Sequence, residues 1–214
     1  MPDTPFAYLR DPAAIYRQSF AIIEAEAGDA LAALPAALRP VARRLIHSCG
    51  MTEIVADLAW AGPVVEAART ALAHGRPILA DVEMVKSGII RSRLPAGVDV
   101  RCTLGEPQVR DIAARLGTTR SAAAVELWRA DLEGTVVVIG NAPTALFHLL
   151  ERLGEWSERP AAILAFPVGF VGAVESKEAL IAASPAVPYL TLCGRRGGSA
   201  MAAAAVNALA DPAS

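Results

Sequence analysis

The chain has 214 residues, a formal net charge of −2 at pH 7, 54% hydrophobic residues and 5% aromatic residues. Without an excess or a block of basic residues, it lacks the electrostatic footprint of a nucleic-acid-binding protein. No run approaches the roughly 18 consecutive apolar residues of a membrane span, and residues 1–5 lack the basic start of a signal peptide. We therefore expect one cytoplasmic domain over residues 1–214, with no nucleic-acid or membrane partner.

Three helices are predicted in the first third of the chain. Asp11 and Pro12 form the N-cap and first position of a helix that extends to about Glu26. A second helix is predicted over residues 40–48 and a third over residues 63–74, each followed by a glycine that can end it.

Five apolar runs then alternate with helical segments. The runs are Pro77–Ala80, Val98–Leu104, Thr135–Ile139, Ala161–Ala165 and Tyr189–Cys193. The second run alternates polar and apolar residues, which favours an edge position, and a long helix is predicted from Thr118 to Leu132. Because parallel strands need helical crossovers, the predicted fold is a three-layer α/β/α sandwich with a mostly parallel sheet of about five strands.

Three of these runs end in loops rich in Gly or Pro. The loops are Gly140–Pro143, Pro167–Gly169 and Gly194–Ser199. Open parallel sheets bind ligands beyond the carboxyl ends of their strands, and glycines let backbone N–H groups approach an anion closely. If there were only one such loop, the geometry of a tight turn would explain its glycines. Because three loops lie on the same edge of the sheet, we expect them to form the floor of a binding site for an anionic ligand.

Common catalytic motifs are absent from the sequence. It contains no G-x-G-x-x-G dinucleotide fingerprint, no P-loop and no G-x-S-x-G elbow. Cys49, Cys102 and Cys193 lie far apart without C-x-x-C spacing, so neither a disulfide framework nor a metal site is expected.

Two basic side chains stand out as candidates for chemistry. His47 ends an apolar stretch near a predicted helix C-terminus, with Arg44 one turn earlier on the same face. The guanidinium would lower the pKa of the imidazole, whereas the helix C-terminus would raise it. A lone helical histidine is more often structural than catalytic. Arg120 lies in the first turn of a predicted helix, where a cation opposes the helix dipole, and this placement favours a ligand-binding role.

Six segments together resemble the precorrin-8X methylmutase family, in order over about residues 8–209. The segments are Arg44–Gly50, Asp81–Val85, Thr119–Ala123, Gly140–Leu146, Pro167–Lys177 and Gly194–Ala200.

The resemblance implies an α/β fold with a parallel sheet, a homodimer and a cofactor-free isomerase. In this reaction a methyl group migrates from ring carbon 11 to ring carbon 12 of precorrin-8X, which gives hydrogenobyrinate. His47 corresponds to the catalytic histidine of the family, and Ser19, Arg44 and Arg120 correspond to residues that contact the ligand. The remaining residues expected to bind substrate are Ser121, Gly140, Asn141, Gly197, Gly198 and Ser199.

Three other functions remain open at this point. The anaerobic branch of the pathway uses a cobalt-containing ring, and nothing in the sequence excludes that substrate. A corrinoid carrier would need the same pocket and arginines but no titrating group, so His47 beside Arg44 favours the enzyme. A nucleotide-binding oxidoreductase on a similar sheet is a weaker alternative.

Overall fold

The computed structural model describes residues 6–183 and 185–211. Residues 1–5, whose sequence gave the expectation of no signal peptide, lie outside the described residues. The α-helices are α1 (Pro12–Ala32), α2 (Arg39–Cys49), α3 (Val64–Ala73), α4 (Glu83–Gly88), α5 (Val109–Leu116), α6 (Arg120–Val125), α7 (Pro143–Glu155), α8 (Ala173–Ala183) and α9 (Ser199–Leu209). Short 3-10 helices are η1 (Thr52–Asp57), η2 (Arg91–Arg93) and η3 (Glu126–Asp131).

The centre of the molecule is a mixed sheet of six strands within the described residues. The strands are β1 (Leu58–Ala61), β2 (Ile78–Ala80), β3 (Val100–Cys102), β4 (Val136–Ile139), β5 (Ala162–Ala165) and β6 (Tyr189–Leu192), in the spatial order β1-β6-β5-β4-β2-β3. All neighbouring pairs are parallel except β1 with β6.

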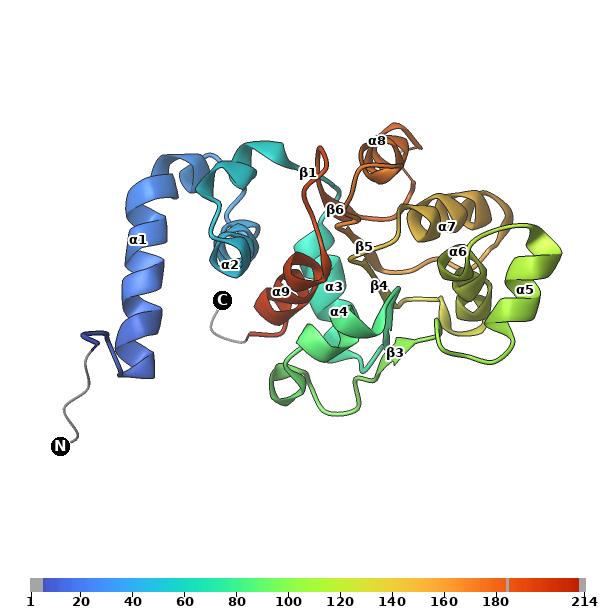
Figure 1. The fold of residues 1–214 in the computed structure, drawn as a ribbon, viewed down its shortest axis with the longest axis horizontal. Coiled ribbons are helices and arrows are strands. Elements are labelled where there is room, and N and C mark those ends of the chain that lie inside the picture. The colour runs from blue at the N-terminus through green and yellow to red at the C-terminus, as the bar shows by residue number, and fades with distance from the viewer. Residues whose placement is uncertain (1–5, 184, 212–214) are drawn as a thin grey trace.

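Helices cover both faces of the sheet, as predicted (Figure 1). Alternate side chains of each strand point to opposite faces, so the central strands are apolar on both sides. Val136 and Val138 pack with α2, α3, α4 and α9 in one core cluster. Val137 and Ile139 pack with α7 and the segment around Trp128 in the other. The expected three-layer sandwich is confirmed, and α1 lies outside it against α2.

The prediction of five strands missed β1. This strand is only four residues long, lies at the sheet edge and has one buried side chain, Leu58. Its sequence, Leu-Ala-Trp-Ala, contains none of the β-branched residues that mark the central strands. β3 lies at the opposite edge, as expected from its alternating pattern, but spans only Val100–Cys102.

Two predicted helices have different bounds in the structure. α1 continues to Ala32, two turns beyond the expected end, because Ala27 and Leu31 are buried against the rest of the core. The expected helix over residues 118–132 is α6 followed by the 3-10 helix η3. Its start was predicted correctly, since the Thr119 hydroxyl accepts a hydrogen bond from the Ala122 N–H.

Candidate active site

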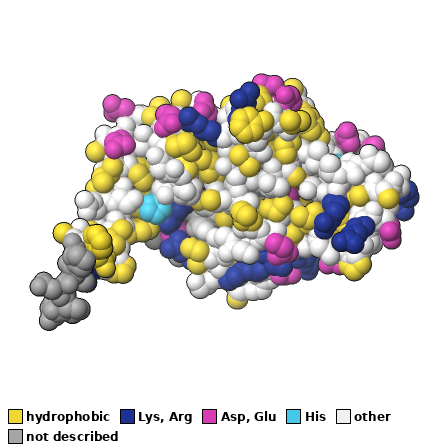
Figure 2. Space-filling view, viewed as in Figure 1, with side chains coloured by type: hydrophobic (Ala, Val, Ile, Leu, Met, Phe, Trp, Pro, Cys, Tyr) yellow, Lys and Arg dark blue, Asp and Glu magenta, His cyan; other side chains and the backbone are white. Residues whose placement is uncertain are grey.

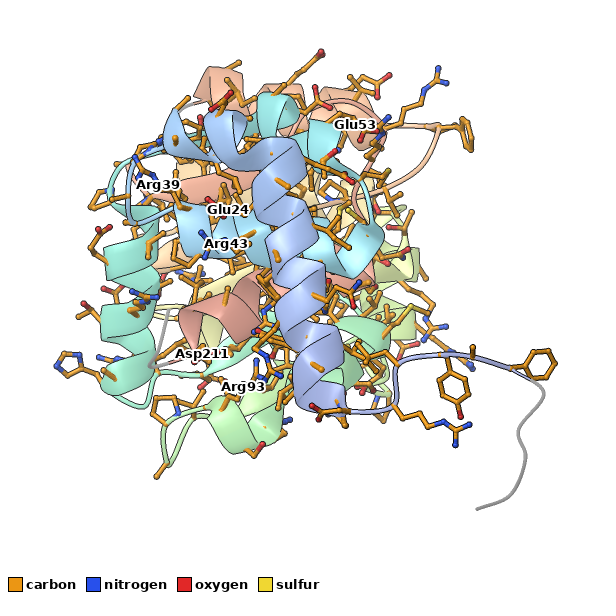
Figure 3. All side chains as sticks on the ribbon, turned by 90° about the vertical axis from the view of Figure 1, so that its left-hand side faces the viewer. Glu24, Arg39, Arg43, Glu53, Arg93 and Asp211 are labelled. Carbon is orange, nitrogen blue, oxygen red and sulfur yellow. The ribbon has the colours of Figure 1, made fainter. Side chains whose placement is uncertain are left out.

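His47 and Ser19 meet where α1 packs across α2. His47 lies in the last turn of α2, and its Nδ1 is 2.9 Å from Oγ of Ser19 in the middle of α1. An ion pair between Arg43 of α2 and Glu24 of α1, 3.1 Å apart, fixes the same helix pair further along (Figure 3). Two residues 28 positions apart in the chain are therefore held in hydrogen-bond contact by helix packing.

Aromatic rings and a guanidinium surround the imidazole. The His47 ring stacks on Phe20, with centroids 5.1 Å apart, and lies 5.8 Å from the ring of Tyr16. The guanidinium carbon of Arg44 is 5.4 Å from the Tyr16 centroid and 5.6 Å from the Phe20 centroid, within cation–π range. His47 and Arg44, which were predicted to be neighbours, therefore contact the same two aromatic rings.

The pKa of His47 is lowered from its ordinary value of 6.5, mainly because partial burial disfavours the charged ring and secondly because Arg44 is a nearby cation. The expected effect of Arg44 is confirmed in direction.

Arg44 reaches a carboxylate at the C-terminal end of the described chain. Its Nη2 is 3.6 Å from Oδ2 of Asp211, and Nη1 of Arg93 is 3.7 Å from the same oxygen (Figure 3). Asp211 therefore draws two arginines together beside α1. An anionic partner at this position shows that the two guanidinium groups can share a carboxylate.

Asp81, directly after β2, organises the loop after β4. One carboxylate oxygen accepts from the N–H of Gly140 at 2.9 Å, and the other accepts from Asn141 at 3.0 Å and Ala142 at 2.8 Å. Burial raises the pKa of Asp81, while these three hydrogen bonds act in the opposite direction. Asp81 lay in a segment of the family resemblance but was not among the predicted site residues.

Gly140 and Asn141 have different surroundings, although both were expected to bind substrate. Asn141 is exposed at the carboxyl edge of the sheet. Gly140 is buried, and a Cβ there would lie 2.5 Å from Cγ2 of Val85 and 2.8 Å from Cβ of Ala202. Its placement favours close packing of α9 and α4 against this loop rather than direct contact with a ligand.

The loops after β5 and β6 face each other across the carboxyl edge. Gly198 donates its N–H to the carbonyl of Phe166 at 2.8 Å, and a Cβ on Gly197 would lie 2.4 Å from that same oxygen. Ser199, the first residue of α9, is 8% exposed. Of these three predicted site residues, Gly197 lines a cavity of about 320 Å³, together with Met51, Val168, Gly169, Phe170, Arg195 and Arg196.

A second cavity, of about 250 Å³, lies beside the His47–Ser19 pair. Its lining residues are Ser19, Ile22, Ile23, Glu26, Ile46, His47, Gly50 and Thr52. Gly50 and Thr52 line this cavity and Met51, between them, lines the other, so the two are neighbours. Arg196 of the loop after β6 pairs with Glu53 at 2.9 Å, which ties that loop to the end of α2. Sequence analysis did not identify Met51, Phe170 or Arg196, because only tertiary packing brings them together.

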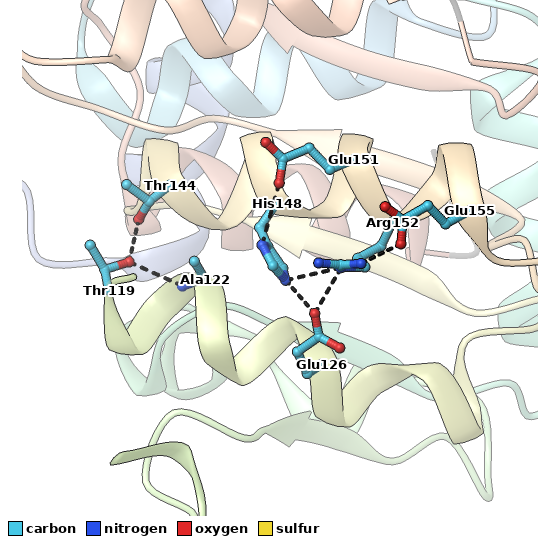
Figure 4. Close-up of polar contacts among 8 residues, drawn as sticks. All are labelled: Thr119, Ala122, Glu126, Thr144, His148, Glu151, Arg152 and Glu155. Carbon is cyan, nitrogen blue, oxygen red and sulfur yellow. Dashed lines mark hydrogen bonds and ion pairs between the residues drawn. The ribbon is translucent and has the colours of Figure 1, made fainter. Parts of the chain in front are cut away.

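Arg120 and Ser121 lie at another part of the carboxyl edge and line neither cavity. Nη2 of Arg120 donates to the carbonyl of Leu104 at 3.0 Å, and Ser121 is half-buried. The hydroxyls of Thr119 and Thr144 are 2.8 Å apart, so the start of α6 adjoins the start of α7 and thereby the loop with Asn141 (Figure 4).

A second histidine, His148, belongs to a separate ionic cluster. His148 is 7% exposed, and its Nε2 lies 2.5 Å from Oε1 of Glu126, which also pairs with Arg152 at 2.8 Å (Figure 4). The cluster joins α7 to the start of η3. The Glu126 carboxylate gives the buried His148 ring a polar partner.

Among residues 6–183 and 185–211, no group of three or more His, Cys, Asp or Glu side chains is arranged to hold a metal ion. No helix in these segments is long and apolar enough to cross a membrane.

Comparisons with known proteins identify the family. Residues 14–212 match the CbiC family model, described as Precorrin-8X methylmutase. Precorrin-8X methylmutase from Pseudomonas aeruginosa is 61% identical over 95% of this chain and 97% of its own, and that from Sinorhizobium sp. is 52% identical over 99% of both. The crystal structure of precorrin-8X methyl mutase from Thermus thermophilus has a TM-score of 0.83 and 37% identity, covering 92% of this chain and 94% of the other. The chain therefore belongs to the precorrin-8X methylmutase family.

Proposed function

We propose that this protein converts precorrin-8X to hydrogenobyrinate in cobalamin biosynthesis, by moving a methyl group from ring carbon 11 to ring carbon 12. The observation that carries the proposal is the His47–Ser19 pair, which stands beside Arg44 and next to the loops at the carboxyl edge of the sheet. Family membership supplies the reaction, and this geometry supplies a titrating group where the ligand would bind.

In the proposed mechanism, His47 donates one proton to the conjugated ring and takes it back after the methyl shift. A lowered pKa makes the imidazolium form of His47 a stronger acid, which favours transfer to a weakly basic ring. The Ser19 hydroxyl engages Nδ1, which leaves Nε2 to exchange the proton. Stacking on Phe20 restricts the ring orientation. The shift is an isomerisation, so atoms and electrons balance without a cofactor.

Substrate binding is assigned to the floor formed by the carboxyl-edge loops. The ring is large, flat and fringed with carboxylates, so it needs apolar contact and cations at its edge. Val168 and Phe170 supply exposed apolar surface, and Arg195 and Arg196 line the same cavity. Arg44 supplies a further guanidinium group beside His47. Asn141, Gly197 and Gly198 remain proposed contacts, and Arg120 and Ser121 are proposed to contact the more distant side of the ring.

The metal-free ring is the proposed substrate because the relatives that are 61% and 52% identical are both named for precorrin-8X. We also propose that residues 1–214 form a single catalytic domain, that the protein acts in the cytoplasm and that it forms a homodimer. The exposed apolar side chains of α1 and the segment before it support the dimer: Phe6, Tyr8, Leu9, Ile15, Tyr16 and Ile22. Figure 2 shows hydrophobic side chains gathered at the N-terminal end of α1.

The deciding experiment mixes purified protein with precorrin-8X and records the absorption spectrum and mass, alongside His47→Ala. We expect wild type to give the orange corrin chromophore without a change in mass, and His47→Ala to bind the product without forming it. The matched control is His74→Ala, because His74 caps the C-terminal end of α3, its Nδ1 contacts the Thr70 carbonyl and it lines neither of the two cavities. If wild type binds precorrin-8X without converting it, the proposed activity is contradicted. That result would favour a corrinoid carrier or an enzyme that acts on the cobalt-containing ring. Full turnover by His47→Ala would remove His47 from the mechanism.

A further inference from the structure

Lys177 is a buried cation that the proposed reaction does not use. It lies on α8, and its side chain is 1% exposed. Its Nζ donates to the carbonyl of Pro167 at 3.2 Å and to the carbonyl of Arg196 at 2.7 Å. Pro167 belongs to the loop after β5 and Arg196 to the loop after β6. One ammonium group therefore joins two loops that are distant in sequence.

The same two loops are held together by further backbone contacts. Gly198 donates to the Phe166 carbonyl at 2.8 Å, and Gly169 donates to the Arg195 carbonyl at 3.3 Å. At Gly197 the backbones are so close that a Cβ would lie 2.4 Å from the Phe166 oxygen and 2.5 Å from the Pro167 oxygen. The spacing of the two loops is thus fixed by several contacts, and the Lys177 bridge adds side-chain hydrogen bonds to the backbone ones.

The two bridged loops supply most of the residues that line the cavity beside Met51. Val168, Gly169 and Phe170 line the cavity from one loop, and Arg195, Arg196 and Gly197 line it from the other. Lys177 contacts the Pro167 carbonyl, directly before the first group, and the Arg196 carbonyl within the second. A change in loop spacing would therefore change the shape of the cavity without removing any residue that lines it.

Burying the Lys177 ammonium group costs free energy of desolvation. Burial lowers its pKa to about 8, against small opposing effects of Cys193 and Asp57. An apolar side chain of similar length would avoid that desolvation but would leave two carbonyl groups without a donor. A buried cation that meets two carbonyl oxygens from two loops suits a role in holding those loops in register.

We propose that Lys177 is a positioning residue for substrate binding, which fixes the spacing of the loops after β5 and β6 by bridging Pro167 and Arg196. The inference rests on the proposed function, because the cavity between these loops is assigned to the tetrapyrrole.

The first test is Lys177→Met, which keeps the length of the side chain and removes the donors. We expect KM for precorrin-8X to rise about 10-fold while kcat stays within about twofold, because the ring binds less well but His47 is unchanged. Thr135→Val is the matched control, since it removes one buried hydrogen bond, to the Leu132 carbonyl, at the opposite end of β4. An unchanged KM in Lys177→Met, or an equal rise in Thr135→Val, would overturn the proposal.

Amide hydrogen exchange separates this proposal from the proposed function. In Lys177→Met we expect faster exchange at Gly169 and Gly198, whose N–H groups cross between the loops, and no change in α5. This readout holds even if wild type fails to convert precorrin-8X. Unchanged exchange at both glycines would refute the bridge.

A second variant covers the case in which Lys177→Met does not fold. Gly197→Ala forces the same two loops apart from the other side and leaves Lys177 in place. Because Gly197 is itself a proposed substrate contact, the supporting readout is amide exchange, and we expect faster exchange at Gly169, whose N–H bonds across the two loops. A wild-type KM in Gly197→Ala would show that loop spacing does not govern binding.

Discussion

Gly140→Ala tests whether the loop after β4 is specified by packing. The added methyl group would lie 2.5 Å from Cγ2 of Val85, 2.8 Å from Cβ of Ala202 and 2.9 Å from the backbone Cα of Ser199. Carbon atoms in contact are normally about 3.5–4.0 Å apart, so α9 and α4 must both give way by about 1 Å. Overpacking of this kind costs about 1–3 kcal/mol.

The magnitude translates into a measurable change in thermal unfolding. For a chain of this length, 1 kcal/mol shifts Tm by about 2–4 °C, so a cost of about 1–3 kcal/mol is expected to lower Tm of Gly140→Ala by about 2–12 °C. Gly154→Ala is the matched control because Gly154 lies in α7 and nothing lies within 4 Å of an added Cβ. That change should stabilise the helix by about 0.5–1 kcal/mol and raise Tm. Thermal unfolding followed by circular dichroism gives Tm of the two variants and of wild type. An unchanged or higher Tm for Gly140→Ala would refute the packing argument.

Two further predictions concern charge. Arg44→Met removes one of the two causes that lower the pKa of His47, so that pKa should rise toward 6.5 and the imidazolium should persist to higher pH. Titration of the His47 ring by NMR measures this, and a midpoint that stays or falls would contradict the assigned cause. Asp81→Ala leaves the N–H groups of Gly140 and Ala142 buried without an acceptor, at about 1–3 kcal/mol each, so the free energy of unfolding should fall by about 2–6 kcal/mol. Urea denaturation measures it, and a loss below about 1 kcal/mol would show that Asp81 does not hold the loop.

The central strands and the positions of the loops that follow them could be predicted from local pattern. β4, β5 and β6 are continuous apolar runs because both of their faces are covered by helices. The Gly- and Pro-rich loops after these strands follow them directly in the sequence, so the positions of the loops could be read from the same pattern. β1 could not be predicted in this way, since Trp60 is 37% exposed and the strand pairs on one side only.

The details of the site depend on contacts between distant segments. Asp81 and the amide of Gly140 are 59 positions apart, and the two carbonyls that Lys177 contacts are 10 and 19 positions from it. Periodicity reports which side of a strand or helix is buried but not which distant group it meets there. For the same reason, Ser19 was assigned to the site through family resemblance rather than from its own sequence context.

The site draws on two structurally separate parts of the fold. The proposed proton-transfer group, His47, and its partner Ser19 come from α2 and α1, which lie at one side of the sandwich (Figure 1). The proposed binding floor consists instead of loops at the carboxyl edge of the sheet. The segment around Met51 and the Arg196–Glu53 ion pair connect the two parts. Because the reacting group and the floor rest on different elements, changes in the loops should act mainly on KM and changes at His47 or Ser19 mainly on kcat. A loop variant that lowers kcat as strongly as His47→Ala would mean that ring position and proton transfer are coupled through this connection.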